Sequence, residues 1–474
     1  MEPDAVLERV EESLDVLAAA GGRHDGMIPS ILDRESGEMR RERPDSISGQ
    51  REVDRAHLGA NLIHDEPVLR TLHAFAEVRD RPEYAAAADS YVERFVTECL
   101  DTETGLFPWG EHAYWHLEAE TVGPDTDDVH IHDHLRQVPL WLWEEIAAVD
   151  ENAVEQFADA LEYHWNDPDR PEYNRHAPID EDRRWPVDDE RSYDFPRHGG
   201  HFVFDWSFAY RRRGREAHRR QIERMLDYWW EKRHESGLLM LESRGNTVLS
   251  PKQTLSLAAT LLQTAETMTD AAPDLAETMR HRGETYVDGF LAAPHDLENG
   301  VFPLGCRRSD VEAGTFDSRG ADPDNNELAA MPIWGSAYGQ NPASMYGLAS
   351  LLAWRHCGEE GLLAWARAAA RRYAAEPFPD GVAVPAKDAG HAVGLFADLY
   401  DVTGDDVWLE RGEELADEVV ERYLDAPLPR GAAGIDWYES QMGPGFLINN
   451  LARIAFLARD GREHAPIGAN YTDR

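Results

Sequence analysis

Cysteine and lysine are scarce in this sequence, and long apolar runs are missing. The 474 residues include three cysteines, Cys99, Cys306 and Cys357, which lie far apart and form no CxxC pair. This spacing excludes a disulfide framework and a zinc ribbon. The chain contains no stretch of about 18 apolar residues, so no transmembrane helix is predicted. The acidic first residues lack the basic flank and apolar core of a signal peptide, so we expect a cytoplasmic protein without a membrane partner.

Sequence motifs of several common chemistries are also absent. The chain has no GxSxG elbow, no Walker loop and no HExxH, and no GxGxxG opens a strand–helix unit. Serine hydrolysis, ATP chemistry and hydride transfer are therefore not supported.

Acidic residues dominate the charge. Asp and Glu number 90 against 47 Lys and Arg, which gives a net charge of −43, and only three of the basic residues are lysines. Because this charge is spread along the chain, binding to a phosphate backbone, and so to nucleic acid, is excluded. The composition is typical of proteins adapted to molar salt, and it predicts folding that depends on salt.

Apolar residues recur with helical spacing in segment after segment, whereas strand-type alternation is confined to short pieces. The predicted helices span 5–20, 66–78, 84–100, 134–148, 153–165, 202–213, 217–232, 252–268, 276–290, 343–356, 362–374, 389–402, 407–423 and 445–458. Glycine-containing loops with short apolar runs follow many of them, which predicts small β-hairpins. We expect an all-α fold, an (α/α)6 or (α/α)7 toroid of helical hairpins with short β-hairpin loops on one rim, in a single domain over 1–474.

Two long loops, 104–133 and 166–200, carry an unusual share of histidine and aromatic residues. The segments GLFPWGEHAYWHL at 105–117 and HIHDHLRQVP at 130–139 contain His112, His116, His130, His132 and His134, with Glu111 and Asp133 among them. Imidazole nitrogen and carboxylate oxygen together are a common ligand set for divalent metals. Helical spacing would place His130 and His134 on one face. Loops of this length are often functional.

Arginine stands beside histidine in two further places. EYNRHAP contains Asn174, Arg175 and His176, and DFPRHGGHFVFDW contains Arg197, His198, His201 and Asp205. Such pairs join a fixed cation to a group that binds metal or moves a proton.

Tryptophan and tyrosine next to Glu, Gln or Asn are typical of a carbohydrate groove, in which flat rings cover sugar faces. The aromatic residues predicted to contact a ligand are Trp109, Trp115, Trp334 and Trp437, with Glu439 and Gln441 beside the last. His391 and Tyr438 are further acid or base candidates.

GLFPWGEHAYW, HDHLRQVPLWLWE and NRH at 174–176 resemble the (α/α)-toroid polysaccharide lyases, especially the family 2 pectate lyases. The resemblance implies a divalent metal, Mn²⁺ or a similar ion with Ca²⁺ as a possibility, held by His112, Asp133 and His176, with Arg175 as the base. The family's acidic ligand is usually glutamate, so His132 or His134 is an alternative ligand here.

A lyase removes the C5 proton of a uronate and expels the 4-linked oxygen, and it needs positive charge near the carboxylate. Arginine is almost always protonated, so His198 and Tyr438 stay open as the base. A polyanion also needs a basic groove in this acidic protein. The candidates for it are Arg51, Arg55, Arg136, Arg175, Arg197 and Arg244. The expected partner is a uronate oligosaccharide, and the oligomeric state is open.

Three other functions compete with the lyase. A toroid glycoside hydrolase acting on unsaturated uronyl oligosaccharides would use Asp133 or Asp205 as general acid and would need no metal. A sugar epimerase would use paired histidines such as His201 and His391. A sugar-binding toroid without activity is the third.

Overall fold

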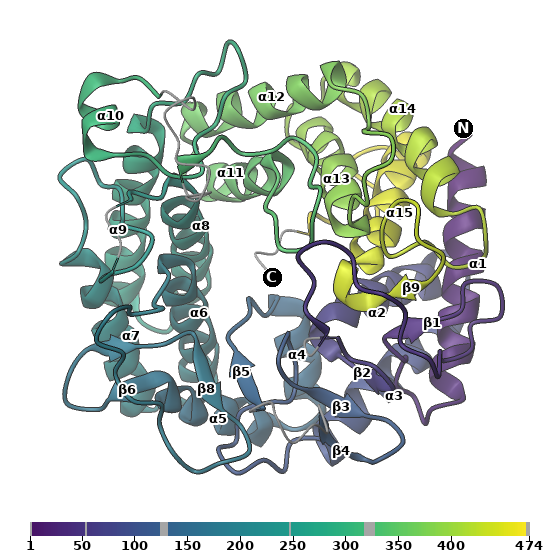
Figure 1. Ribbon diagram of the computed structural model, residues 1–474, viewed down its shortest axis with the longest axis horizontal. Coiled ribbons are helices and arrows are strands. Elements are labelled where there is room, and N and C mark those ends of the chain that lie inside the picture. The colour runs from purple at the N-terminus through teal and green to yellow at the C-terminus, as the bar shows by residue number, and fades with distance from the viewer. Residues whose placement is uncertain (1, 53–54, 124–130, 246–247, 317–327, 471–474) are drawn as a thin grey trace.

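The computed structural model describes residues 2–52, 55–123, 131–245, 248–316 and 328–470. In this part of the chain, helices alternate between an inner and an outer ring around a common axis (Figure 1). The inner helices are α2 (Leu62–Val78), α4 (Leu140–Val149), α6 (Pro196–Arg213), α8 (Pro251–Met268), α11 (Ala343–Cys357), α13 (Ala386–Thr403) and α15 (Pro444–Asp460). The outer helices are α1 (Pro3–Gly22), α3 (Pro82–Glu98), α5 (Glu151–Ala160), α7 (Glu216–Trp230), α9 (Pro273–Ala292), α12 (Glu360–Ala375) and α14 (Asp406–Tyr423). A short helix, α10 (Arg308–Ala313), lies in a loop.

The inner helices close the ring through their neighbours. Contacts run from α6 through α8, α11, α13 and α15 to α2. Helix α4 completes the circle, because Trp141 contacts His73 of α2 and Trp143 stacks on Phe208 of α6. The predicted all-α toroid is confirmed, and the described helices form seven inner–outer pairs.

Apolar patterning explains which helices are inside. Helix α13 buries nearly every residue from Ala386 to Leu399, whereas α14 buries only one stripe that includes Trp408, Ala416 and Tyr423. Inner helices also approach closely where a side chain is missing. A Cβ on Gly390 of α13 would lie 2.7 Å from the backbone nitrogen of Leu447 in α15. One cluster of buried hydrophobic side chains consequently extends from Val6 to Ile467.

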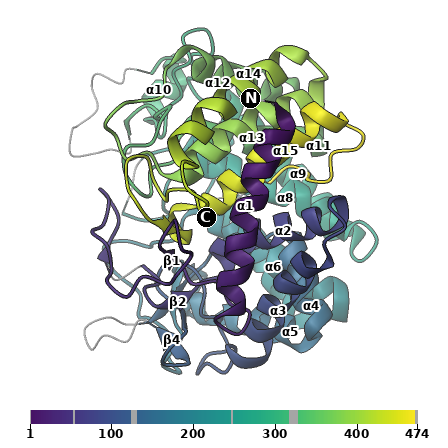
Figure 2. The ribbon, with the colours of Figure 1, turned by 90° about the vertical axis from the view of Figure 1, so that its right-hand side faces the viewer.

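Short strands occupy the loops at one rim of the ring (Figure 2). β1 (Ile31–Leu32) pairs with β9 (Tyr438–Glu439), and β2 (Gly59–Ala60), β3 (Tyr114–His116) and β4 (Thr121–Gly123) form a three-stranded sheet. β5 (His132–His134) pairs with β8 (His176–Pro178), and β6 (Trp165–Asp167) with β7 (Glu172–Tyr173). All of these pairs are antiparallel. Every helix in the described ranges is too short or too polar to span a lipid bilayer.

The predicted helix over 134–148 is wrong at its start. Residues 132–134 form strand β5, and α4 begins at Leu140, after Pro139. The expectation that helical spacing aligns His130 with His134 is therefore not met, and His130 itself lies outside the described residues. Conversely, the helix predicted to begin at 202 already starts at Pro196.

Candidate metal centre and arginine cluster

Three of the predicted metal ligands converge at this rim. His112, His134 and His176 can each offer a ring nitrogen, and these atoms lie within 4.8 Å of one another. His112 comes from the loop before β3, His134 from β5 and His176 from β8. Nε2 of His134 and Nε2 of His176 are buried and have no hydrogen-bond partner among the described residues. Buried polar atoms are normally satisfied, so this arrangement fits a bound cation.

The sheet register creates this cluster. β5 and β8 are antiparallel, with His134 directly opposite His176. The side chain of Asn174 accepts a hydrogen bond from the backbone N–H of His176 at 2.9 Å, which fixes the start of β8. Asn174 thus positions the candidate metal ligand His176. This role does not require Asn174 to contact a bound metal or sugar itself.

Asp133 does not join the histidines, which corrects its prediction as the acidic ligand. Successive side chains of a strand point to opposite faces, so Asp133 faces away from its neighbours His132 and His134. Its carboxylate is fully buried and lies 3.0 Å from Nε2 of His164. His132 is close to the cluster, with its ring 4.2 Å from that of His112 and 5.0 Å from that of His176.

The carboxylate beside the histidines belongs to Glu111. Its Oε2 lies 2.9 Å from Nδ1 of His134 and 2.6 Å from Nη2 of Arg136. Because a carboxylate only accepts hydrogen bonds, Nδ1 of His134 is the donor, and Nε2 is left with its lone pair toward the cluster. Burial alone would raise the pKa of Glu111, but the charge of Arg136 and the hydrogen bond from His134 hold it well below its ordinary value.

Two histidines of the cluster, His134 and His176, are held neutral. Burial lowers the pKa of His134 well below its ordinary value, and the charge of Arg136 adds to this effect. The pKa of His176 is lowered in the same way, first by burial and then by His134 and Arg175. Neutral imidazole is the form that binds a metal ion.

Arg175 lies next to this cluster and has no carboxylate within ion-pair distance among the described residues. Its backbone N–H and its Nη1 both donate to the carbonyl of Tyr193, at 3.2 and 3.4 Å. Its guanidinium lies 4.3 Å from the ring centre of Phe195, and the guanidinium of Arg197 lies 5.4 Å from the same ring. Burial and the charge of Arg197 lower the pKa of Arg175 to about 10.

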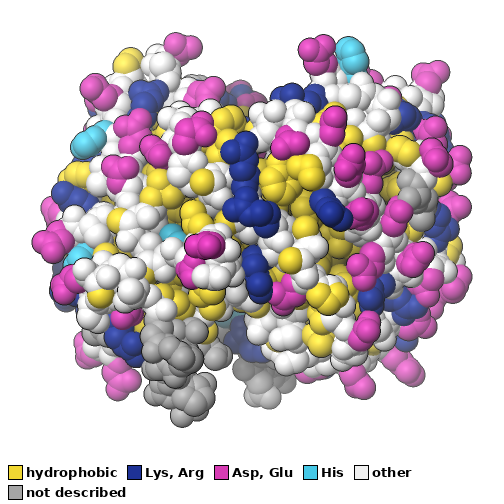
Figure 3. Space-filling model, turned by 90° about the horizontal axis from the view of Figure 1, so that it is seen from above, with side chains coloured by type: hydrophobic (Ala, Val, Ile, Leu, Met, Phe, Trp, Pro, Cys, Tyr) yellow, Lys and Arg dark blue, Asp and Glu magenta, His cyan; other side chains and the backbone are white. Residues whose placement is uncertain are grey.

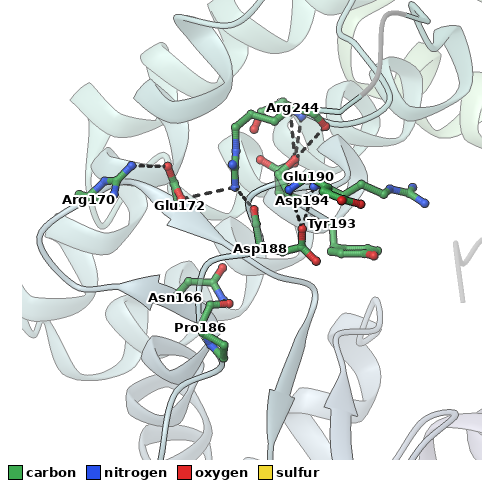
Figure 4. Close-up of polar contacts among 12 residues, drawn as sticks. Asn166, Arg170, Glu172, Pro186, Asp188, Glu190, Tyr193, Asp194 and Arg244 are labelled. Carbon is green, nitrogen blue, oxygen red and sulfur yellow. Dashed lines mark hydrogen bonds and ion pairs between the residues drawn. The ribbon is translucent and has the colours of Figure 1, made fainter.

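Hydrogen bonds hold in place the loop around Tyr193, to which Arg175 is bonded. Tyr193 has a positive φ of 55°, a conformation that is unfavourable for an aromatic residue. Its backbone N–H donates to the fully buried carboxylate of Glu242, which also pairs with Arg191. Arg244 reaches the carbonyl of Asp188 at 2.8 Å and Glu172 at 3.5 Å (Figure 4). These bonds tie Arg244 to the loop, and its role as a sugar contact stays a prediction.

Two further predicted residues border the cluster. An Nη2 atom of Arg51 lies 3.4 Å from both ring nitrogens of His112. The ring of His198 is 5.6 Å from that of His134, and both of its nitrogens are buried without a hydrogen-bond partner in the described part of the chain. Burial and the charge of Arg197 keep the pKa of His198 well below its ordinary value.

Three of the predicted aromatic ligand contacts are instead core residues. Trp109 is 1% exposed and packs among Phe95, Phe107 and Trp143. Trp115, in β3, and Trp334 are 8% and 9% exposed and belong to the same hydrophobic cluster. Their large apolar surface explains this placement, because burying an aromatic ring outweighs its polar edge.

The residues around 437–441 form a hydrogen-bonded network in which Glu439 and Gln441 are buried and Trp437 is half-buried. Arg55 makes a bidentate ion pair with Glu439, with Nε–Oε1 and Nη2–Oε2 distances of 2.8 and 2.7 Å, and both side chains are buried. Gln50 donates to Glu439 and to Gln441, and the indole of Trp437 donates to Glu439 at 2.9 Å. The network ties the loop that carries Arg51 to β9.

Tyr438 and His391 are both fully buried. Tyr438 points to the opposite face of β9 from Glu439, and burial next to Asp65 raises its pKa well above the ordinary value. This position excludes Tyr438 as a base for a substrate at the histidines. His391 is fully buried on α13, with its ring 4.9 Å from Phe446 of α15.

Two residues next to the histidine cluster, Tyr338 and Trp185, were not identified from the sequence. Tyr338 donates a hydrogen bond to Oε1 of Glu111 at 3.0 Å, although it lies far along the chain. Trp185, from the long acidic loop, places its ring 5.0 Å from that of His132 and 5.9 Å from that of His176. The length of that loop was a signal for Trp185, whereas nothing in the local sequence marks Tyr338.

Comparison with known families agrees with the geometry. Residues 47–203 match the family model described as periplasmic pectate lyase, and this segment contains His112, His134, Arg175 and His176. The match confirms the resemblance to pectate lyases and identifies the protein as an enzyme of the lyase class on an α/α toroid. Comparison with curated proteins gave no match.

Several solved carbohydrate-active structures resemble the whole chain weakly. An unsaturated glucuronyl hydrolase specific for heparin shares 11% identity over 97% of this chain and 99% of its own, with a TM-score of 0.47. A D-mannose isomerase shares 9% identity over 94% and 97%, with a TM-score of 0.46. A cellobiose 2-epimerase from Bacillus thermoamylovorans shares 12% over 96% and 99%, also with a TM-score of 0.46. Scores this low carry no information about the reaction.

Proposed function

We propose that the protein cleaves 4-linked uronate chains such as pectate by metal-assisted β-elimination. The observation that carries this proposal is the convergence of His112, His134 and His176 beside Arg175, which forms no ion pair with a carboxylate of the described residues. The match of residues 47–203 to a pectate lyase family supports the choice of a uronate as substrate.

The donor set fits a divalent transition metal such as Mn²⁺. Three imidazoles, one of them oriented by Glu111, form a nitrogen-rich site of the kind that such ions occupy. A metal ion bound there would neutralise the uronate carboxylate and stabilise the negative charge that develops on it. Ca²⁺, which prefers oxygen ligands, fits this set less well.

The protein's own groups supply the rest of the reaction. In our proposal Arg175 acts in its neutral form, which its lowered pKa of about 10 makes more accessible. It accepts the C5 proton, the electrons of the C5–H bond form a C4=C5 double bond, and the C4–O4 bond breaks. The leaving O4 takes a proton from solvent water and becomes the new hydroxyl end, and Arg175 returns its proton to solvent before the next turnover. Arg51 lies beside His112, and Arg197 lies near Arg175 over the ring of Phe195. Their charge attracts an anionic sugar into an otherwise acidic protein.

The buried carboxyls make a glycoside hydrolase the weaker alternative. Asp133 and Asp205 are 0% and 2% exposed, and Asp205 accepts a hydrogen bond from the indole of Trp143 at 2.7 Å. A general acid must reach the glycosidic oxygen, which neither carboxyl does in this arrangement.

The epimerase alternative would need His201 and His391 to act as a pair. They lie on α6 and α13, two inner helices that α8 and α11 separate in the ring, so this arrangement does not favour an epimerase.

The proposal is tested by incubating the protein with polygalacturonate, alginate and unsaturated uronyl oligosaccharides in molar KCl. We expect absorbance at 235 nm to rise with one of the polymers, to stop rising after chelation, and to recover when Mn²⁺ is added. Loss of absorbance from unsaturated oligosaccharides would instead favour the hydrolase. Product formation that chelation leaves unchanged would overturn the metal-assisted mechanism.

A further inference from the structure

A cavity of about 540 Å³ adjoins the metal candidates on the same rim. Its lining includes Ser250, Lys252, Leu304, Tyr338, Gln340 and Asn341. Tyr338 connects the two places, because it lines the cavity and donates a hydrogen bond to Glu111 of the histidine cluster. Tyr338 therefore belongs both to the wall of the cavity and to the surroundings of the histidine cluster.

Backbone hydrogen bonds hold the walls of the cavity in place. The loops before α8 and after α9 are joined by reciprocal bonds between Leu249 and Cys306, both 2.9 Å. A bond of 2.9 Å from Leu304 to Ala329 joins the second loop to the segment before α11. The backbone N–H of Tyr338 donates to Ser48 at 2.8 Å. The cavity is thus formed before a ligand arrives, which lowers the entropic cost of binding.

The lining suits an anionic sugar. No Asp or Glu is among the described residues that line the cavity, although the chain has 90 of them, and Lys252 provides a positive charge. Ser336 donates to Oε1 of Gln340 through its N–H at 2.7 Å and its hydroxyl at 3.2 Å, which leaves the amide nitrogen of Gln340 as a donor. Asn341 and Ser250 add polar groups, and the alanines and leucines form an apolar wall. The volume lies in the range of small-ligand sites, about 300–1,000 Å³.

We infer that this cavity is a subsite for a uronate residue of the bound chain, remote from the bond that breaks, with Lys252 pairing with its carboxylate. The inference rests on the proposed function and adds a preference for oligomers long enough to reach the cavity. Binding energy from such a remote residue raises kcat/KM for long substrates and leaves the shortest ones unaffected.

The test compares Lys252→Met and Lys252→Arg with wild type on galacturonate oligomers of increasing length. Lys232→Met is the matched control, because Lys232 lies over the ring of Tyr228 at the end of α7, outside the cavity. We expect Lys252→Met to lower kcat/KM about 10- to 100-fold on long oligomers but not on the shortest one that is cleaved. Lys252→Arg should recover part of the loss, and Lys232→Met should behave as wild type. Equal kcat/KM for Lys252→Met and wild type at every length overturns the subsite.

Calorimetric binding separates this inference from the proposed reaction. Even if wild type forms no unsaturated product, weaker binding of a long galacturonate oligomer to Lys252→Met supports the subsite. With a methyl-esterified oligomer, which lacks the carboxylates, wild type and Lys252→Met should bind equally. A loss of affinity of the same size for charged and esterified oligomers would contradict the ion pair.

Discussion

His134 and His176 face each other across the antiparallel strands β5 and β8, with their ring centres 4.5 Å apart. Each strand belongs to a different interhelical loop, so the pair exists only because the two loops meet at one rim. Both rings keep a buried Nε2 without a hydrogen-bond partner in the described ranges. This relationship underlies the proposed chemistry, and it can be tested directly.

Replacing either histidine should strongly reduce binding of Mn²⁺. We expect His134→Ala and His176→Ala to bind less than a tenth as much Mn²⁺ as wild type at micromolar concentrations, because a three-ligand site loses a coordinating nitrogen. Metal content after dialysis measures this loss. His281→Ala, an exposed histidine on α9, is the control. Full metal content in both cluster variants would move the site elsewhere.

Arg175→Ala should abolish turnover while the protein still folds. The loss should be about 10²- to 10⁴-fold in kcat, the usual contribution of a positioned proton acceptor. Arg175→Lys should not rescue the rate, because lysine cannot present the planar guanidinium that bonds to Tyr193 and lies over Phe195. Retained metal content and an unchanged melting temperature show that folding is intact. An active Arg175→Ala enzyme would exclude this residue as the base.

Stability should depend on pH through Asp65 of α2. Burial raises the pKa of Asp65 from 3.8 to about 7, and its Oδ2 accepts a hydrogen bond from Tyr91 at 2.7 Å. Between pH 4 and 7 the folded state keeps a proton that the unfolded state has lost, so stability falls as pH rises through this window, by up to about 4 kcal/mol. The neighbouring Tyr91 and Tyr438 stay neutral there, because burial raises the pKa of each.

Asp65→Asn removes this titration and keeps the hydrogen bond from Tyr91. We expect the melting temperature of the variant to exceed that of wild type at pH 8 and to match it near pH 4. Asp45→Asn, at an exposed position, should show no such trend. A constant difference in melting temperature across the pH range would contradict a protonated Asp65.

Molar salt should stabilise the fold. Acidic side chains are distributed over the surface, and a group of basic ones lies near the middle of the face in Figure 3. Raising salt from 0.1 to 1 M shortens the Debye length from about 10 to about 3 Å and screens the repulsion among these carboxylates. We expect the melting temperature to rise with KCl. The same melting temperature in dilute buffer and in molar KCl would refute the inferred salt adaptation.

The fold was predictable because its information is local. The stripe of Trp408, Ala416 and Tyr423 in α14 and the nearly continuous burial of α13 follow from residue spacing alone. The site was predictable only in part. His112 and His176 were identified from residues that resemble a family, but Asp133 was preferred to His134 because a linear motif does not say which face of a strand each side chain occupies.

Sequence alone determined that the chain makes helical hairpins, that it is strongly acidic, and that histidine and arginine gather in two loops. Tertiary structure decided which of those histidines share a centre, because strand pairing turns Asp133 toward His164 and His134 toward His176. It also decided that Glu111 orients His134 and that Tyr338 joins this centre to the cavity with Lys252. These contacts depend on which distant loops come together when the ring closes, and residue spacing along the chain does not determine that.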